Sequence, residues 1–393
     1  WKVIDHKDAM KKIFLVILSS IIWVACLMAG SELSYRRPLW NDEIYTQTNT
    51  IDKISYIDIF SGRIPEGNNA PLFYLIQKGV CDLTRYQFQV AWKGEWFLHD
   101  EHAQVLLRGV SNVCMSTAIA VLFFALSYLY SIGLAILALV FMLAVPSVWF
   151  YWIEARPYAL WFFLTVIQSI FFIKAAQSIK KGGRDWLWLC LSHVMLSLTI
   201  AFGAVQAIVA SIALWLLDER RWGRYLGLTI IPAATGFFYY QHSPKFKYWF
   251  QNGPLRLILD NVPAEYWMLL VLCLAAVYFL GPIKGLKPSP SMNPYAPFAV
   301  LMIAAAWAVL GVLKYKANPG TEGFAISSRY FLFLIPVASM ALAFIVRDLW
   351  RRFTNDSLIR LNILIVVGGF LMLRAVKAYI AILASGTFMH VIR

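Results

Sequence analysis

Two adjacent carboxylates, Asp42 and Glu43, combine the residue types and the surroundings that acid–base chemistry needs. They lie in the sequence WNDEIY at positions 40–45, where apolar and aromatic residues flank both acids. Removing a carboxylate from water raises its pKa and makes it a stronger base near neutral pH. We therefore predict Asp42 as a general base and Glu43 as a residue that orients the substrate or shares the proton. The alternative is a solvated pair on a loop.

A second set of candidate residues stands at the predicted span ends, where arginines and tyrosines could bind an anion. The set consists of Arg108, Glu154, Arg156, Tyr158, Arg329 and Tyr330. A guanidinium forms paired hydrogen bonds with phosphate oxygens, so these arginines favour a phosphate-bearing substrate. Two simpler interpretations stay open. Arg108 could extend to the membrane surface as an ordinary interfacial arginine, and Glu154 and Arg156 could form a mutual or network salt bridge that fixes a turn.

The elements that must position these residues are membrane-spanning helices. Of the 393 residues, 60% are hydrophobic and 14% are charged, whereas roughly a quarter are charged in a soluble domain. Residues 109–153 contain no charged side chain, and this run is long enough for two spans of about 20 residues. The composition excludes a soluble globular protein and predicts an all-α polytopic membrane protein.

The apolar runs predict about eleven transmembrane helices in a single membrane domain over residues 1–393. The predicted spans are 13–31, 105–128, 133–153, 157–175, 186–201, 203–217, 225–241, 266–283, 295–313, 329–346 and 358–376. A tight hairpin near Phe202 and Gly203 is expected within 186–217, because basic clusters flank that run on both sides. Residues 32–104 form a long outer loop, residues 105–393 hold the remaining spans, and no separate soluble domain is expected.

The formal net charge of +14 has a topological explanation. With these spans, the clusters of Lys and Arg fall on one side of the membrane, and basic loops are typical of the cytoplasmic side. The N-terminus is then cytoplasmic, with Met10 as a candidate native start. The loop 32–104 lies on the outer face of a membrane that we expect to be a bacterial inner or plasma membrane. Nucleic-acid binding, the other explanation of a basic chain, is not expected.

The outer loop carries two predicted amphipathic helices on the membrane surface, at residues 49–60 and 70–83. A turn-rich segment separates them. His99 and His102 have a spacing that could hold a divalent metal, although a solvated loop is the simpler interpretation. The five cysteines show no metal or disulfide spacing. No metal ligands are therefore assigned, and the need for a divalent metal is left open.

Several short motifs follow one another in a distinctive order. W-x-D-E-x-Y occupies residues 40–45, P-L-x-Y occupies 71–74, L-L-R with a small residue occupies 106–109, E-A-R-x-Y-A-L occupies 154–160, and a late span opens with Arg329 and Tyr330. Together they resemble the GT-C superfamily of integral-membrane glycosyltransferases. The nearest branches are the dolichyl-phosphate-mannose protein mannosyltransferases and the bacterial RgtA/B/C/D-like and aminoarabinose transferases. The resemblance covers residues 13–160 well and the remainder loosely.

This resemblance implies a GT-C-like fold and a specific reaction. A monosaccharide would move from a polyprenyl-phosphate donor to an acceptor hydroxyl on the non-cytoplasmic face, commonly with inversion at the anomeric carbon. Asp42 would be the general base, and the second set of candidates would contact the donor. Asn69 stands where relatives often have histidine, so it would act by hydrogen bonding alone. The implied partners are a lipid-linked sugar donor, a glycan, lipid or protein acceptor, membrane lipids and, as a further option, a membrane-protein complex.

Two other function classes stay open. A transporter or flippase of lipid-linked precursors would share the apolar spans. Transporters, however, place charged groups or broken helices near the membrane midplane, whereas the ionisable residues here collect at one predicted interface. A non-catalytic relative that serves as an assembly subunit would keep the fold, and the presence of Asp42 and Glu43 argues mildly against it.

Overall fold

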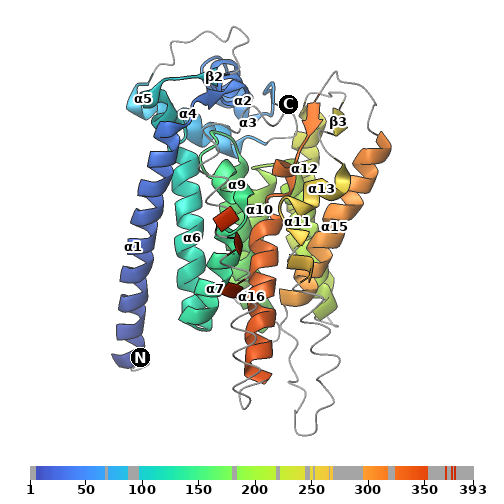
Figure 1. The fold of residues 1–393 in the computed structure, drawn as a ribbon. Helices are drawn as coiled ribbons and strands as arrows, with labels where there is room; N and C mark the ends of the chain where they lie inside the picture. The colour runs from blue at the N-terminus through green and yellow to red at the C-terminus, as the bar shows by residue number, and fades with distance from the viewer. Residues whose placement is uncertain are drawn as a thin grey trace.

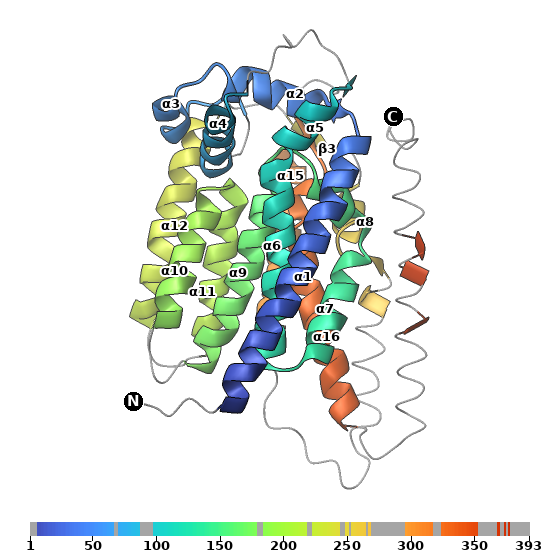
Figure 2. The same cartoon turned by 90° about the vertical axis from the view of Figure 1, so that its left-hand side faces the viewer.

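The computed structural model describes residues 6–66, 70–86, 97–178, 184–217, 222–243, 248–250, 253–264, 266–268, 295–316 and 324–352, with short pieces between 368 and 377. Within these residues the protein is almost entirely helical, which confirms the predicted all-α class. Figures 1 and 2 show a bundle of helices that run roughly alongside one another, with short helices gathered at one end. We call that end the loop end of the bundle.

Nine helices of the described residues form the bundle. They are α1 (His6–Arg36), α6 (Gly109–Leu129), α7 (Ile132–Leu143), α9 (Tyr158–Gln177), α10 (Arg184–Ser197), α11 (Ala201–Leu217), α12 (Trp222–His242), α15 (Tyr295–Lys316) and α16 (Leu334–Arg352). α6 packs against α1, α7 and α9, while α11 packs against α12 and α15. Their buried apolar side chains form one continuous core, which holds the loop end in place.

The other elements lie mainly at the loop end (Figure 1). They are β1 (Leu39–Trp40), α2 (Asn41–Thr46), the π-helical turn η1 (Gln47–Ile51), α3 (Tyr56–Phe60), α4 (Leu72–Thr84), β2 (Phe97–Leu98), α5 (Glu101–Leu107), α8 (Pro146–Trp152), β3 (Tyr248–Phe250), α13 (Pro254–Leu259), β4 (Phe324–Ile326) and the 3₁₀ turn η2 (Ser328–Phe331). β1 pairs antiparallel with β2, and β3 pairs parallel with β4.

Three helices in the described part of the chain are long and apolar enough to cross a membrane: Asp8–Arg36, Gly109–Leu129 and Tyr158–Gln177. The number rises to four if α7 and α8 together make one span, but those two helices are bent by 78° at their junction. The span predicted over 133–153 is thus divided into two helices, which together are apolar enough for one broken span. Pro146 begins α8, and a proline cannot donate the backbone hydrogen bond that would continue α7.

Two predicted boundaries among the later spans move. The hairpin within 186–217 lies at residues 198–200, between α10 and α11, because Phe202 and Gly203 are already helical. The span predicted from residue 329 begins as η2 and becomes the α-helix α16 only at Leu334. The predicted spans 266–283 and 358–376 lie almost entirely outside the described residues.

In the outer loop, the predicted helix at 70–83 is confirmed as α4. The predicted helix at 49–60 is divided between η1 and α3. The division has a local cause, since the Ser55 hydroxyl accepts a hydrogen bond from the Asp58 backbone N–H and so starts a new helix. The helix α2, which carries Asp42 and Glu43, was not predicted.

A polar contact joins α1, α6 and α8 near the loop end. A Cβ atom added at Gly30 of α1 would lie 2.0 Å from the Asn112 side-chain oxygen of α6, so the two helices cross here at close range. The Asn112 amide donates to the Leu27 carbonyl at 3.0 Å, and its oxygen accepts from the Trp152 indole at 2.9 Å. This contact holds the ends of three helices together below Arg108.

Candidate functional site

Eight charged side chains gather at the loop end, and we call them the charge cluster. They are the carboxylates of Asp42, Glu43, Glu66 and Glu154 and the guanidinium groups of Arg37, Arg108, Arg156 and Arg329. Asp42 and Arg37 are partly exposed, and the other six residues are buried. Because an unpaired charge is costly to bury, the partner of each group indicates what it can do.

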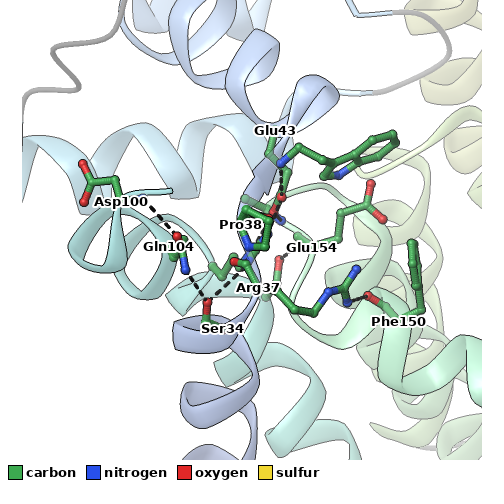
Figure 3. A network of polar contacts seen from close by, with 12 residues as sticks. Ser34, Arg37, Pro38, Glu43, Asp100, Gln104, Phe150 and Glu154 are labelled. Atoms are coloured by element: carbon green, nitrogen blue, oxygen red, sulfur yellow. Dashed lines mark hydrogen bonds and ion pairs between the residues drawn. The ribbon is translucent and has the colours of Figure 1, made fainter. Parts of the chain in front are cut away.

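Glu43 and Arg108 form the most completely paired unit of the cluster. The Arg108 Nε and Nη2 atoms donate to the two Glu43 oxygens at 2.8 Å and 2.6 Å. The same oxygens accept from the backbone N–H groups of Ala155 and Trp40 at 2.7 Å and 3.2 Å. Arg108 also donates to the backbone carbonyls of Ser34, Arg37 and Pro38. Figure 3 shows Glu43, Arg37, Pro38 and Ser34 gathered along these contacts.

This pairing gives Glu43 and Arg108 an architectural role. A guanidinium has five N–H donors, and the five hydrogen bonds of Arg108 use them all. The geometry therefore argues against the predicted contact of Arg108 with a phosphate. It argues equally against Glu43 as a base, because its oxygens are fully engaged. Glu43 caps the first turn of α2 through Trp40 and fastens α2 to α6 and to residues 154–156.

Glu66 and Arg156 form a second buried pair, which sequence reasoning missed. Arg156 Nη1 donates to the Glu66 carboxylate at 2.7 Å and to the Thr46 hydroxyl at 2.6 Å. The hydroxyl groups of Thr46 and Thr50 donate to the other Glu66 oxygen. Arg156 thus pairs with Glu66 and not directly with Glu154, so the structure agrees with the network form of the simpler interpretation and not with the mutual pair. A lone acid in a turn-rich segment is typical of a solvent-exposed residue, so the sequence contains no signal for its burial.

Asp42 and Arg329 form a third pair, which is open to solvent. Arg329 Nη1 donates to the Asp42 carboxylate at 2.9 Å, and the Asp42 side chain is 31% exposed. The Arg329 guanidinium also lies over the rings of Trp40, Tyr158 and Tyr330, at 5.5 Å, 5.6 Å and 5.5 Å from their centroids. The fold therefore brings together two candidates that are 287 residues apart in sequence.

Burial and the neighbouring cations shift the pKa of the Asp42 carboxyl in opposite directions. Burial alone would raise the pKa of the Asp42 carboxyl, but the positive charges of Arg329 and Arg156 outweigh it and hold the pKa below its usual value. The expectation that burial makes Asp42 a stronger base was therefore wrong in direction. Its basicity depends on Arg329, because a carboxylate that loses a cationic partner regains affinity for a proton.

Glu154 is the carboxylate of the cluster that has a close cation but no hydrogen bond. It lies in the turn between α8 and α9, and neither carboxyl oxygen has a hydrogen-bond partner among the described residues. Arg329 Nη1 is 3.8 Å from one of these oxygens. Burial raises the pKa of Glu154 to about 7, although Arg329 and Arg156 oppose the rise. Near neutral pH this carboxyl is therefore only partly ionised.

The aromatic candidates and Arg37 complete the surroundings of the site. The buried rings of Tyr158 and Tyr330 meet edge to face, with centroids 6.0 Å apart. Arg37 donates to the Phe150 carbonyl at 3.3 Å and lies 4.6 Å from the centre of that ring. Burial and the nearby charge of Arg108 lower the pKa of Arg37 to about 10, so it is still cationic at neutral pH. Sequence reasoning did not select Arg37.

Three other candidate positions are Asn69, His99 and His102. Asn69 lies outside the described residues. His102 faces the ring of Tyr86 at 5.5 Å, and no group of three His, Cys, Asp or Glu side chains suited to a metal gathers among the residues that the structure describes. The residues present thus do not indicate a ligand set around His99 and His102.

An apolar pocket adjoins the cluster between α11, α15 and η2. Its lining includes Phe202, Val205, Met302, Ala306, Phe331 and Phe333. The Phe202 ring is 6.2 Å from both the Phe331 and the Tyr330 rings. Gln206 also lines this cavity, and its free volume of about 10 Å³ is close to that of one water molecule.

Comparison with known proteins assigns no family to this arrangement. No protein-family model matches the chain, and no curated protein matches its sequence.

Proposed function

We propose that this protein is a glycosyltransferase that moves a monosaccharide from a polyprenyl-phosphate donor to an acceptor hydroxyl. One observation carries the proposal: Asp42, the exposed carboxylate of the charge cluster, is paired with Arg329. The side chains of Glu43, Glu66 and Glu154 are 0%, 4% and 3% exposed, whereas that of Asp42 is 31% exposed. An acceptor hydroxyl can therefore reach Asp42 but not the other three carboxylates, and Asp42 is the general base.

The reaction follows from this pair. The acceptor oxygen attacks the anomeric carbon while its proton passes to Asp42. The bond between that carbon and the phosphate oxygen breaks, and its electron pair leaves with the lipid phosphate. Arg329 stabilises the negative charge on this leaving group. Attack from the face opposite the phosphate gives inversion at the anomeric carbon.

Donor binding also activates the base. A phosphate that binds Arg329 competes with Asp42 for the same guanidinium. As Arg329 moves to the phosphate, the cation that lowers the Asp42 pKa is drawn away, and the carboxylate becomes a stronger base. The ion pair of the empty protein thus keeps Arg329 positioned until the donor arrives.

Aromatic rings surround the Arg329 guanidinium in the empty protein. Tyr158 and Tyr330 flank Arg329 and are kept in the proposal as donor contacts. Arg156 is paired with Glu66 and is not proposed to contact the donor. Asn69 keeps its predicted role in substrate binding, and the need for a divalent metal stays open.

The membrane arrangement is part of the proposal. We place about eleven spans in a GT-C-like fold, with the N-terminus in the cytoplasm and the charge cluster on the outer face of a bacterial inner or plasma membrane. Three long apolar helices support the membrane assignment. α1 begins at the end of the bundle far from the loop end (Figure 1), and its first turns carry Lys11 and Lys12, as expected of a cytoplasmic end.

The decisive experiment measures transfer by Asp42→Asn. Purified protein in lipid nanodiscs receives a panel of farnesyl-phosphoryl monosaccharides with membrane extract as acceptor, and the release of farnesyl phosphate is followed. Loss of the base lowers the rate about 10²- to 10⁴-fold, while the unfolding temperature stays close to that of the wild type. Asp58→Asn makes the same change at an exposed carboxylate of the same loop and keeps the wild-type rate.

Two results would contradict the proposal at different levels. Equal rates for the wild type and Asp42→Asn would remove Asp42 from the role of base. A wild-type protein that is folded but transfers no sugar from any of the donors would exclude a glycosyltransferase of this kind.

A further inference from the structure

The four carboxylates of the charge cluster differ in how their charge is balanced. Glu43, Glu66 and Asp42 each accept at least one direct hydrogen bond from an arginine, at distances between 2.6 Å and 2.9 Å. Glu154 accepts none, although its residue is 96% buried, with 4% of its surface exposed. A buried carboxylate without hydrogen bonds is costly in its ionised form. Glu154 is therefore the member of the cluster that gains most from a proton.

The charges that face Glu154 come from every element around it. Arg329 approaches from η2, Arg156 belongs to the same turn, and Arg37 follows α1. The like charges of Asp42 and Glu43 come from α2. Tyr151 of α8 also lies close enough to interact. With four carboxylates and four guanidinium groups all ionised, the cluster has no net charge, so an arriving anion would leave it with a negative charge.

We propose that Glu154 takes up one proton from solvent when a phosphate diester binds at Arg329. This inference rests on the proposed function, because it assumes that the donor phosphate binds there. One proton adds to a carboxyl oxygen of Glu154 and no other bond changes, so the net charge of the cluster is the same before and after binding. The resulting acid is a hydrogen-bond donor beside Arg329, where the ionised form could only repel the phosphate.

The affinity of Glu154 for protons agrees with this role. Its pKa of about 7 in the empty protein means that the ionised and neutral forms are both populated near neutral pH. A nearby anion raises a carboxyl pKa further, so the bound state holds the proton more tightly. Proton uptake should approach one per bound diester at pH 8 and should vanish near pH 5.5, where Glu154 is already protonated.

The experiment uses farnesyl methyl phosphate, a diester whose single negative charge is constant over this pH range. Calorimetric titration of the detergent-solubilised full chain, in two buffers with different heats of ionisation, gives the number of protons taken up. The wild type should take up close to one proton at pH 8, and its affinity should fall about fivefold between pH 7 and pH 8. Glu154→Gln should bind the diester with no proton uptake and no such fall.

Glu32→Gln is the matched control, since it makes the same chemical change at an exposed residue of α1 that pairs with Arg36. It should keep the wild-type uptake. Wild-type binding without uptake at pH 8 would overturn the inference while leaving the proposed function intact. Uptake that persists in Glu154→Gln would also overturn it, by assigning the proton to another group. If the wild type binds no diester at all, the proposed function fails and the inference fails with it.

Discussion

Asp42 and Glu43 are neighbours in sequence and have opposite roles in the structure. The Glu43 side chain is fully buried and accepts hydrogen bonds from both sides of a guanidinium and from two backbone N–H groups. The Asp42 side chain is 31% exposed, and its partner within the cluster is Arg329. Two identical functional groups thus become an architectural element and a candidate base.

The difference arises from the geometry of the helix that carries them. Successive side chains of a helix point in directions about 100° apart, so adjacent residues do not share a face. In α2, Glu43 therefore contacts Arg108 at the start of α6, and Asp42 contacts Arg329 of η2. The lesson is that an acidic pair should be judged by the partner of each residue, because adjacency does not imply a shared function.

Glu43→Gln tests this comparison with the largest expected effect. The change leaves Arg108 buried without a counter-charge, and breaking a buried ion pair typically costs about 3–5 kcal/mol. We expect a large fall in the midpoint of chemical unfolding in detergent, whereas Asp42→Asn stays near the wild-type midpoint. A Glu43→Gln protein with normal stability but no transfer would reverse the roles assigned to the two neighbours.

Glu154→Gln separates a carboxylate without hydrogen bonds from the fully bonded Glu43. The pKa of Glu154 rises from 4.5 in the unfolded chain to about 7 in the folded protein. Its protonated form therefore stabilises the fold fully below pH 4.5, and this contribution is lost as the pH rises through 7, by about 3 kcal/mol. The amide cannot ionise, so the variant escapes this loss.

The measurement for Glu154→Gln is the unfolding midpoint at pH 4.5 and at pH 8. Relative to the wild type, the variant should gain stability on moving to pH 8, and Glu32→Gln should show no such gain. If the wild type and Glu154→Gln differ in stability by the same amount at both pH values, the charge of Glu154 is balanced by its partners as fully as that of Glu43.

Arg329→Ala and Arg329→Lys test whether Arg329, the partner of the exposed Asp42, binds the phosphate diester. A charge-assisted hydrogen bond contributes about 1.5–3 kcal/mol, so Arg329→Ala should weaken the binding of farnesyl methyl phosphate about 10- to 100-fold. Arg329→Lys keeps the charge but loses the paired geometry, and its loss should be smaller. Equal affinities in the wild type and both variants, measured by calorimetry, would show that the diester binds elsewhere.

Ser111→Ala has the smallest expected effect. The buried Ser111 hydroxyl donates to the Glu154 carbonyl at 2.6 Å and holds the turn between α8 and α9 against α6. Loss of one such bond costs about 1 kcal/mol. Ser61→Ala removes a similar bond to a loop carbonyl, that of Asp58, at a partly exposed position and should cost less. Thermal unfolding of both variants compares them, and a larger loss in Ser61→Ala would count against the turn as a rigid part of the site.

Much of the secondary structure was predictable from local signals. The apolar runs that became α1, α6 and α9 are long and carry charge only near their ends, and the helical spacing at residues 70–83 became α4. Local signals were weaker where the helices end. The bend between α7 and α8 could have been predicted from Pro146, whereas the start of α16 at Leu334 depends on how η2 packs.

The candidate site was predictable as a list of residues but not as a set of pairs. Asp42, Glu43, Arg108, Glu154, Arg156 and Arg329 all lie in the cluster, as expected from their place at the ends of helices. The sequence did not indicate Glu66 or Arg37, because neither stands in a motif. It suggested a mutual or network salt bridge for Glu154 and Arg156, and the structure shows the network form, in which Arg156 pairs with Glu66 and Glu154 lies near Arg329.

By itself, the sequence determined the helical class, the membrane character and the gathering of ionisable residues near the ends of apolar helices. These properties follow from composition and spacing along the chain, which act over a few turns. The tertiary structure alone decided which arginine meets which carboxylate, and therefore which acid is exposed, which is fully bonded and which can take up a proton. Those outcomes depend on burial and on charges from remote segments, such as Arg329 beside Asp42, and no local pattern contains them.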